Sequence, residues 1–171
     1  MTYREIRIEV KQNPEKRFRH MIYWMRVAYL LTQKKSCFLK LIGKVCGSYY
    51  SFISGWLLGV DISYNTKIGK GLVIYHGMGL VINPLSTIGE NIILRHNTTI
   101  GNAHINGAAP QIGDNVDVGC HSVIIGDIYI GDNCIIGAGT LINKNVPDNC
   151  IVVGNPAVII KQDGILCCKT L

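Results

Sequence analysis

The sequence lacks several features that would indicate common protein classes. Its longest uncharged apolar stretch, Val45–Val60, has sixteen residues and includes Gly and Ser, so it is short for a membrane-spanning helix. The first twenty residues carry charges throughout and do not resemble a secretory signal peptide. No nucleic-acid recognition motif accompanies the basic residues, so DNA or RNA is not an expected partner. What is present is a chain of 171 residues, 48% of them hydrophobic, which is enough to form a buried core.

Paired cysteine spacings are also absent. The seven cysteines are an odd number and do not follow the spacing of a metal site: Cys37, Cys46, Cys120, Cys134, Cys150, Cys167 and Cys168. We expect reduced thiols rather than a disulfide framework, which favours a cytoplasmic protein. We also expect no bound metal.

Acidic residues are scarce in the first third of the chain. Residues 1–60 contain eleven Lys or Arg and three Glu, a net charge of +8, whereas residues 61–171 have a net charge of −2. A helical pattern begins at Pro14 and ends near Lys35, and the apolar stretch described above follows it. We interpret the segment as a helical cap or a subunit contact. Its basic surface could also rest on an anionic membrane, at the inner face of the cell membrane.

The dominant positive feature is an aliphatic residue at every sixth position. An α-helix repeats at 3.6 residues and a strand at two, so neither explains this period. A short strand followed by a sharp corner does, and three such units close one triangular turn with the aliphatic side chains inside. The series runs through Ile62, Ile68 and Ile74, then after two extra residues through Ile82, Ile88, Leu94, Ile100, Ile112, Val118, Ile124, Ile130, Ile136 and Ile142.

This period predicts a mainly β protein, a parallel β-helix with a short N-terminal helical segment. Glycine follows many of the aliphatic residues, and Gly, Asn and Asp accept the left-handed backbone conformation of sharp corners. We expect a helical cap over residues 1–60, the β-helix over residues 61–162 and a C-terminal tail over residues 163–171.

The two extra residues lie between Ile74 and Ile82 and place a histidine, His76, at a corner. One turn later, allowing for the insertion, the equivalent position is His96, so the two imidazoles should stack at about 4.8 Å, the usual strand spacing. A single corner histidine would more often be a solvated surface group. Two stacked histidines beside a glycine-bordered insertion indicate a functional site, because imidazole acts as a base near neutral pH.

Several motifs resemble one known family over about residues 20–162. They are Gly59-Val60-Asp61-Ile62, the inserted Tyr75-His76-Gly77, and Val153-Gly154-Asn155-Pro156-Ala157. Together they resemble the hexapeptide-repeat acyltransferases, in the branch that contains serine O-acetyltransferases and capsular or colanic-acid polysaccharide O-acetyltransferases. The resemblance implies a left-handed parallel β-helix, a homotrimer, and acetyl-CoA bound in the groove between neighbouring subunits.

The resemblance also implies residue roles. His76 matches the general base, which would take the proton of an acceptor hydroxyl as the oxygen attacks the thioester. Asp61 matches the carboxylate that orients this imidazole, although a corner-capping aspartate is the alternative. Positions that match cofactor contacts are Gly101, Cys120, Ala138, Lys144 and Lys161.

Two departures concern the acceptor. Serine acetyltransferases place an Asp before the catalytic histidine and an Arg-His pair before a loop proline, where this chain has Tyr75 and Ala108-Ala109. Because charged partners for the amino acid are missing, we expect a sugar hydroxyl of a capsule, exopolysaccharide or O-antigen as the acceptor. Candidate contacts to the acceptor are Tyr75, Asn83, His96, Asn97 and His104.

Three other interpretations stay open. The chain could be a serine O-acetyltransferase with unusual substrate contacts, an enzyme that acetylates the amino group of a sugar, or a structural β-helix without catalysis. The spacing of Asp61 and His76 argues against the structural interpretation.

Overall fold

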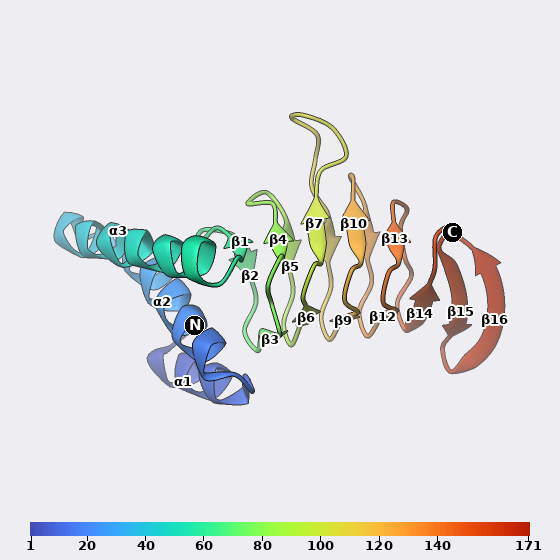
Figure 1. The fold of residues 1–171 in the computed structure, drawn as a ribbon, viewed down its shortest axis with the longest axis horizontal. Helices are drawn as coiled ribbons and strands as arrows, with labels where there is room; N and C mark the ends of the chain where they lie inside the picture. The colour runs from blue at the N-terminus through green and yellow to red at the C-terminus, as the bar shows by residue number, and fades with distance from the viewer.

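The computed structural model describes all 171 residues as a helical segment followed by a parallel β-helix (Figure 1). The predicted fold is confirmed. Four helical elements come first: α1 (Tyr3–Gln12), α2 (Lys16–Thr32), α3 (Cys37–Ser51) and the π-helix η1 (Phe52–Leu57), which continues α3. None of these helices is both long enough and apolar enough to span a membrane.

The β-helix consists of short strands that stack in three sheets, which are parallel except at the C-terminal edge of the third. One sheet has the order β1-β4-β7-β10-β13, a second β11-β8-β5-β2, and the third β16-β15-β14-β12-β9-β6-β3. The strands are β1 (Asp61–Ile62), β2 (Lys67–Ile68), β3 (Val73–Tyr75), β4 (Val81–Ile82), β5 (Thr87–Ile88), β6 (Ile93–Arg95), β7 (Thr99–Gly101), β8 (Gln111–Ile112), β9 (Asp117–Val118), β10 (Val123–Ile125), β11 (Tyr129–Ile130), β12 (Ile135–Ile136), β13 (Leu141–Ile142), β14 (Cys150–Val153), β15 (Val158–Gln162) and β16 (Ile165–Thr170).

The sixth-position aliphatic residues form the core. In the first sheet one buried column consists of Ile62, Ile82, Ile100, Ile124 and Ile142, which are paired in register from strand to strand. Corresponding columns from the other two sheets fill the rest of the triangular interior. Burial of these side chains is the main stabilising contribution to such a coil.

One corner is held by a ladder of asparagines. Asn91, Asn115, Asn133 and Asn149 all adopt positive φ, and each of the first three donates its side-chain amide to the next Oδ1 at 3.1 Å. Asparagine tolerates this conformation, and its amide both donates and accepts, so one residue type serves every turn. The position two residues before Asn91 must lack a side chain. At this position, Gly89, a Cβ would lie 2.5 Å from the carbonyl oxygen of Gly113.

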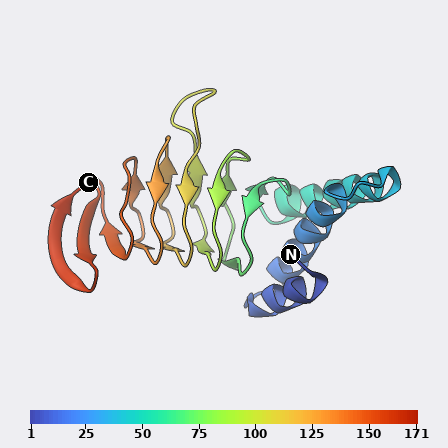
Figure 2. The same ribbon diagram turned by 180° about the vertical axis from the view of Figure 1, so that it is seen from behind.

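The register corrects one step of the predicted repeat. Thr99 pairs with Val123, 24 positions later, whereas Val123 pairs with Leu141 after 18. The interval between Ile100 and Ile112 is therefore a single unit enlarged by six residues, and residues 102–110 form a loop that projects from the β-helix (Figures 1 and 2). The six extra residues equal one repeat in length. The aliphatic residues therefore stay at multiples of six along the sequence, and the periodicity alone does not distinguish the loop from the β-helix.

The C-terminal end closes with antiparallel strands. β14 pairs with β15, and β15 with β16, in antiparallel register. Residues 163–171, expected as a tail, thus include strand β16, which forms the last edge of the third sheet. All seven cysteines are free thiols, with Cys134 and Cys150 buried and Cys37 and Cys168 exposed.

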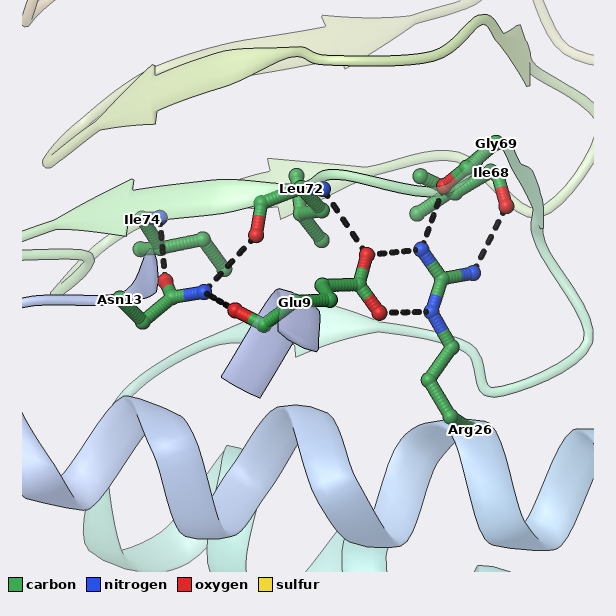
Figure 3. Close-up of polar contacts among 7 residues, drawn as sticks. All are labelled: Glu9, Asn13, Arg26, Ile68, Gly69, Leu72 and Ile74. Atoms are coloured by element: carbon green, nitrogen blue, oxygen red, sulfur yellow. Dashed lines mark hydrogen bonds and ion pairs between the residues drawn. The ribbon is translucent and has the colours of Figure 1, made fainter. Parts of the chain in front are cut away.

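At the other end, α1 and α2 cover the first turn through a buried polar network (Figure 3). The Arg26 guanidinium donates to both carboxylate oxygens of Glu9, at 2.9 and 2.7 Å, and to the carbonyl oxygens of Ile68 and Gly69. Glu9 also accepts the backbone N–H of Leu72 at 2.8 Å. These backbone groups belong to the first turn, which has no earlier strand to pair with, so the side chains replace the missing strand partners.

Asn13 extends the same network toward the site. Its amide nitrogen donates to the carbonyl oxygen of Leu72 at 2.8 Å, and its Oδ1 accepts the N–H of Ile74 at 2.8 Å. Asn13 is fully buried. The junction between α1 and α2 is thereby fixed against strand β3, directly before the inserted corner.

Candidate functional site

Four residues named from the sequence form one column at the corner that follows the third sheet. Tyr75 pairs with Arg95, and Asp117 pairs with both Ile93 and Ile135. Counting forward from these pairs aligns His76, His96, Cys120 and Ala138 on four successive turns. The ring centroids of His76 and His96 are 6.5 Å apart. The structure therefore brings the expected base, one expected acceptor contact and two expected cofactor contacts to the same edge.

The carboxylate beside His76 comes from the N-terminal segment. Glu15 Oε1 lies 3.1 Å from His76 Nδ1 and also accepts the backbone N–H of His76 at 2.8 Å. His76 itself has positive φ and a side chain that is 73% exposed. A carboxylate on Nδ1 fixes that nitrogen as the one that carries hydrogen, which leaves Nε2 free to accept a proton from a substrate.

Glu15 is itself held as an anion. Burial raises the pKa of its carboxyl, but the hydrogen bond from the His76 backbone and the Arg17 guanidinium, 2.6 Å away, lower it, and the net pKa is below the ordinary value. The negative charge is therefore present at neutral pH. Glu15 could not be predicted from the sequence, because 61 positions separate it from His76 and no local motif joins them.

Asp61 does not pair with His76 in this chain. It lies exposed at the start of β1, and its side chain makes no hydrogen bond or ion pair. Its backbone N–H donates to Leu80 at 2.8 Å, which fixes the main chain next to the inserted corner. Within the chain, the carboxylate that contacts His76 is therefore that of Glu15 and not that of Asp61.

A third histidine, His121, joins the column and was not identified from the sequence. Its ring centroid is 5.1 Å from that of His96, and ligand atoms of His96, Cys120 and His121 all lie within 4.8 Å of one another. His96 Nδ1 is buried without a hydrogen-bond partner. Imidazole and thiol groups of this kind are the ligands of zinc and copper. Counting one more turn from Asn97 would have found His121, but the loop at residues 102–110 hid the register.

The other expected cofactor contacts are dispersed. Gly101 ends β7 and pairs with Ile125, at the opposite end of the first sheet from the histidine column. Lys144 donates to the carbonyl oxygen of Leu171 at 2.6 Å, so its ammonium group already has a partner. Lys161 lies on β15, which is five strands from β3 in the third sheet, or roughly 24 Å at the usual strand spacing.

The expected acceptor contacts divide between two corners. Tyr75 and Asn97 lie beside the histidine column, where Arg95 covers the Tyr75 ring and Asn97 approaches His121 Nε2 at 3.4 Å. Asn83 lies at the far end of the sheet, where its amide donates to Asn102 Oδ1 at 2.8 Å. His104 is in the projecting loop, and its carbonyl oxygen accepts the Gly107 N–H at 2.9 Å. A single chain does not unite these residues around one acceptor.

Comparison with known proteins agrees with the repeat. Residues 109–144 match the family described as bacterial transferase hexapeptide, six repeats. The chain belongs to the hexapeptide-repeat acyltransferase family. Similar curated relatives are serine acetyltransferases, from Staphylococcus aureus (40% identical over 122 residues, 70% of this chain and 57% of the relative) and Synechococcus elongatus (34% over 142 residues, 82% and 55%). The chain thus spans a little over half the length of these relatives.

Solved structures give the same result. The serine acetyltransferase of Neisseria gonorrhoeae, in complex with serine, is 32% identical with a TM-score of 0.67 over 82% of this chain and 56% of that one. The enzyme of Brucella abortus is 26% identical with a TM-score of 0.76 over 94% and 69%. These findings overturn the prediction of a sugar acceptor, because the similar relatives and solved structures named above are serine acetyltransferases and not polysaccharide enzymes.

Proposed function

We propose that this protein is an acetyl-CoA-dependent O-acetyltransferase whose acceptor is serine. The observation that carries the proposal is the His76–Glu15 pair, at the corner where the chain resembles serine acetyltransferases. The similarity to serine acetyltransferases, including one solved with serine bound, supports the choice of acceptor.

In the proposed reaction, His76 Nε2 takes the proton of the serine hydroxyl while its oxygen attacks the thioester carbonyl of acetyl-CoA. An alcohol is too weak an acid to ionise near neutral pH, so a positioned base is required. The carbon–sulfur bond then breaks, and the leaving thiolate takes the proton back from the imidazolium. The products are O-acetylserine and CoA. Glu15 stabilises the imidazolium between the two proton transfers.

The acetyl-CoA arm would run along the column, from His76 toward Ala138. Cys120 and Ala138 lie on the next turns at the same corner, and both have small side chains. Lys161, further along the third sheet, is at a suitable separation for a phosphate of the extended cofactor. We propose that Gly101 and Lys144, which lie away from the histidine column, also contact the cofactor.

The proposal includes a homotrimer. Within one chain, Asn83, Gly101 and His104 lie at a different corner from His76, and His76 is largely exposed. A neighbouring copy could place its loop at residues 102–110 against the histidine column of the first and so enclose the acceptor. An exposed base gains from such enclosure, because excluding water strengthens the electrostatic interactions in the site.

Serine recognition should be weak. Tyr75 offers no charge to the ammonium group of serine, and Ala108 and Ala109 offer none to its carboxylate. Two arginines lie near the column, and both are already paired: Arg95 with Asp117, and Arg17 with Glu15. We therefore expect turnover of serine with a high KM.

The test is acetyl transfer from acetyl-CoA to L-serine by the full chain, measured as O-acetylserine by mass spectrometry. His76→Ala should lower kcat/KM by about 10²–10⁴-fold, the usual contribution of a positioned base. His20→Ala is the matched control, because His20 contacts Tyr49 in the helical segment and lies outside the column. If wild-type protein forms no O-acetylserine at saturating serine, or if His76→Ala keeps full turnover, the proposal fails.

A further inference from the structure

A stripe of exposed apolar side chains runs along α3 and η1. Its members recur every three or four residues, as expected for one face of a helix. They are Phe38 (69% exposed), Leu41 (61%), Val45 (64%), Tyr49 (44%), Phe52 (54%) and Trp56 (85%), and we call this set the α3 stripe.

The opposite face of the same helix is the one that packs against the protein. Gly43, Gly47 and Tyr50 are buried there, where a Cβ on Gly43 would meet Thr32 of α2 and one on Gly47 would meet Tyr64. Of the α3 stripe, Tyr49 alone contacts α2, through His20 and Trp24, and the other five side chains project into solvent. Both ribbon views show α3 extending away from the first turn of the β-helix, at the end opposite β16 (Figures 1 and 2). A continuous apolar surface of this kind marks an interaction site.

The charge around the stripe is of one sign. Residues 16–60 contain eight Lys or Arg and no Asp or Glu. Lys34, Lys35, Lys40 and Lys44 are exposed and make no ion pair. Lys40 and Lys44 are one turn apart on α3, and helical spacing places them at the edge between the buried face and the stripe.

The two arginines at the start of α2 are less available. Arg17 pairs with Glu15 at 2.6 Å, and Arg19 donates to the carbonyl oxygen of Asn13 at 2.6 Å. On α3 and in the turn before it, the exposed cations without an ion pair are Lys34, Lys35, Lys40 and Lys44; at the start of α2 only Lys16 shares this property.

We propose that the α3 stripe and its four lysines bind an anionic lipid surface. The apolar side chains would enter the boundary between headgroups and acyl chains, and Lys ammonium groups would pair with lipid phosphates. Trp56 suits this depth, since it combines an apolar ring with a polar group and is 85% exposed. A second copy of this chain fits less well, because it would bring two segments of the same positive charge together. The inference is independent of the proposed acetyl transfer.

The test is co-sedimentation of the full chain with lipid vesicles at low and at physiological salt. Vesicles of phosphatidylcholine with phosphatidylglycerol should bind the protein, and vesicles of phosphatidylcholine alone should not. Binding should weaken as salt rises, because the lysine contribution is screened. Trp56 should report the contact by a blue shift of its fluorescence when anionic vesicles are added.

Two variants separate the apolar and the charged parts. The double replacement Phe38→Ser and Trp56→Ser removes two ends of the stripe, and Lys40→Gln with Lys44→Gln removes two charges. Each should lower vesicle binding about tenfold or more. Leu166→Ser is the control, because Leu166 is equally exposed (82%) but lies at the far end of the β-helix. All the replaced side chains are exposed, so the unfolding temperature should stay unchanged.

Wild-type protein that ignores anionic vesicles at low salt would overturn the proposal. So would a stripe variant that binds them as tightly as wild type. If light scattering shows that the stripe variant forms a smaller assembly than wild type and neither binds vesicles, the stripe is a contact between copies of the chain, which also overturns it.

Discussion

Glu15 contacts His76 twice, through the imidazole Nδ1 at 3.1 Å and through the backbone N–H at 2.8 Å. One carboxylate oxygen therefore holds both the ring and the main chain of the inserted corner. Asn13 fixes the position of Glu15, because its side chain is hydrogen-bonded to the adjoining strand β3. The helical segment thus does more than cover the open end of the β-helix: it completes the surroundings of the proposed base.

Glu15→Gln tests this relationship. The amide keeps the size of the side chain but removes the charge that stabilises the imidazolium, so kcat should fall about 10–100-fold, less than on loss of the base itself. The KM for acetyl-CoA should stay near that of wild type, since Glu15 lies off the proposed cofactor path. Steady-state kinetics with serine and acetyl-CoA measure both.

Asp61→Asn is the comparison for that variant. Because the Asp61 side chain makes no hydrogen bond or ion pair in the chain, its replacement should reduce kcat less than Glu15→Gln does. Glu15→Asp should retain part of the activity, which a purely structural role would not require. A larger loss in Asp61→Asn than in Glu15→Gln would return the orienting role to Asp61.

Arg26→Met should destabilise the protein by about 3–5 kcal/mol, because it leaves the carboxylate of Glu9 buried without its partner. The first turn also loses the donors to Ile68 and Gly69. Urea unfolding followed by circular dichroism measures the change. Lys70→Met is the control: Lys70 forms an exposed pair with Glu90 at 3.5 Å, and the loss of such a pair costs at most about 1 kcal/mol. Equal effects of the two replacements would contradict the capping role.

The buried thiols should react slowly with thiol reagents. Burial raises the pKa of Cys134 to about 11, so the reactive thiolate is scarce at pH 8 and its fraction grows as the pH approaches 11. In the native protein, Cys37 and Cys168 should be labelled first, because they are exposed. Mass spectrometry of peptides after timed labelling with iodoacetamide gives the order. Labelling of Cys134 as fast as Cys168 at pH 8 would contradict the buried placement.

Zinc should inhibit acetyl transfer. A Zn²⁺ ion bound by His96, Cys120 and His121 would occupy the corner that the thioester must pass. His121→Ala removes one ligand and should raise the zinc concentration for half inhibition about tenfold or more. Inhibition assays with and without a chelator measure this, and equal zinc sensitivity in the variant would exclude the cluster as the binding site.

The sequence by itself determined the coil. A period of six can be satisfied only by a strand and a corner, and this local rule fixed the β-helix, its aliphatic core and the alignment of His76 with His96. The alignment of His76 with His96 was predictable because the turns of a β-helix repeat a nearly constant number of residues, and the one insertion between them is visible in the sequence. The alignment could not be extended by counting residues past the loop at residues 102–110, because the turn that contains this loop is longer. His121 was therefore not predicted as part of the column.

Only the tertiary structure decided what surrounds the base. Glu15 reaches His76 because Glu9, Asn13 and Arg26 bind the unpaired backbone groups of the first turn, and no sequence period describes such a contact. The exposure of the α3 stripe was equally undetermined by the sequence, since an apolar helix face can be buried or exposed according to what packs on it. Contacts within a repeat follow from spacing along the chain, whereas contacts between the helices and the coil depend on how two separate units dock.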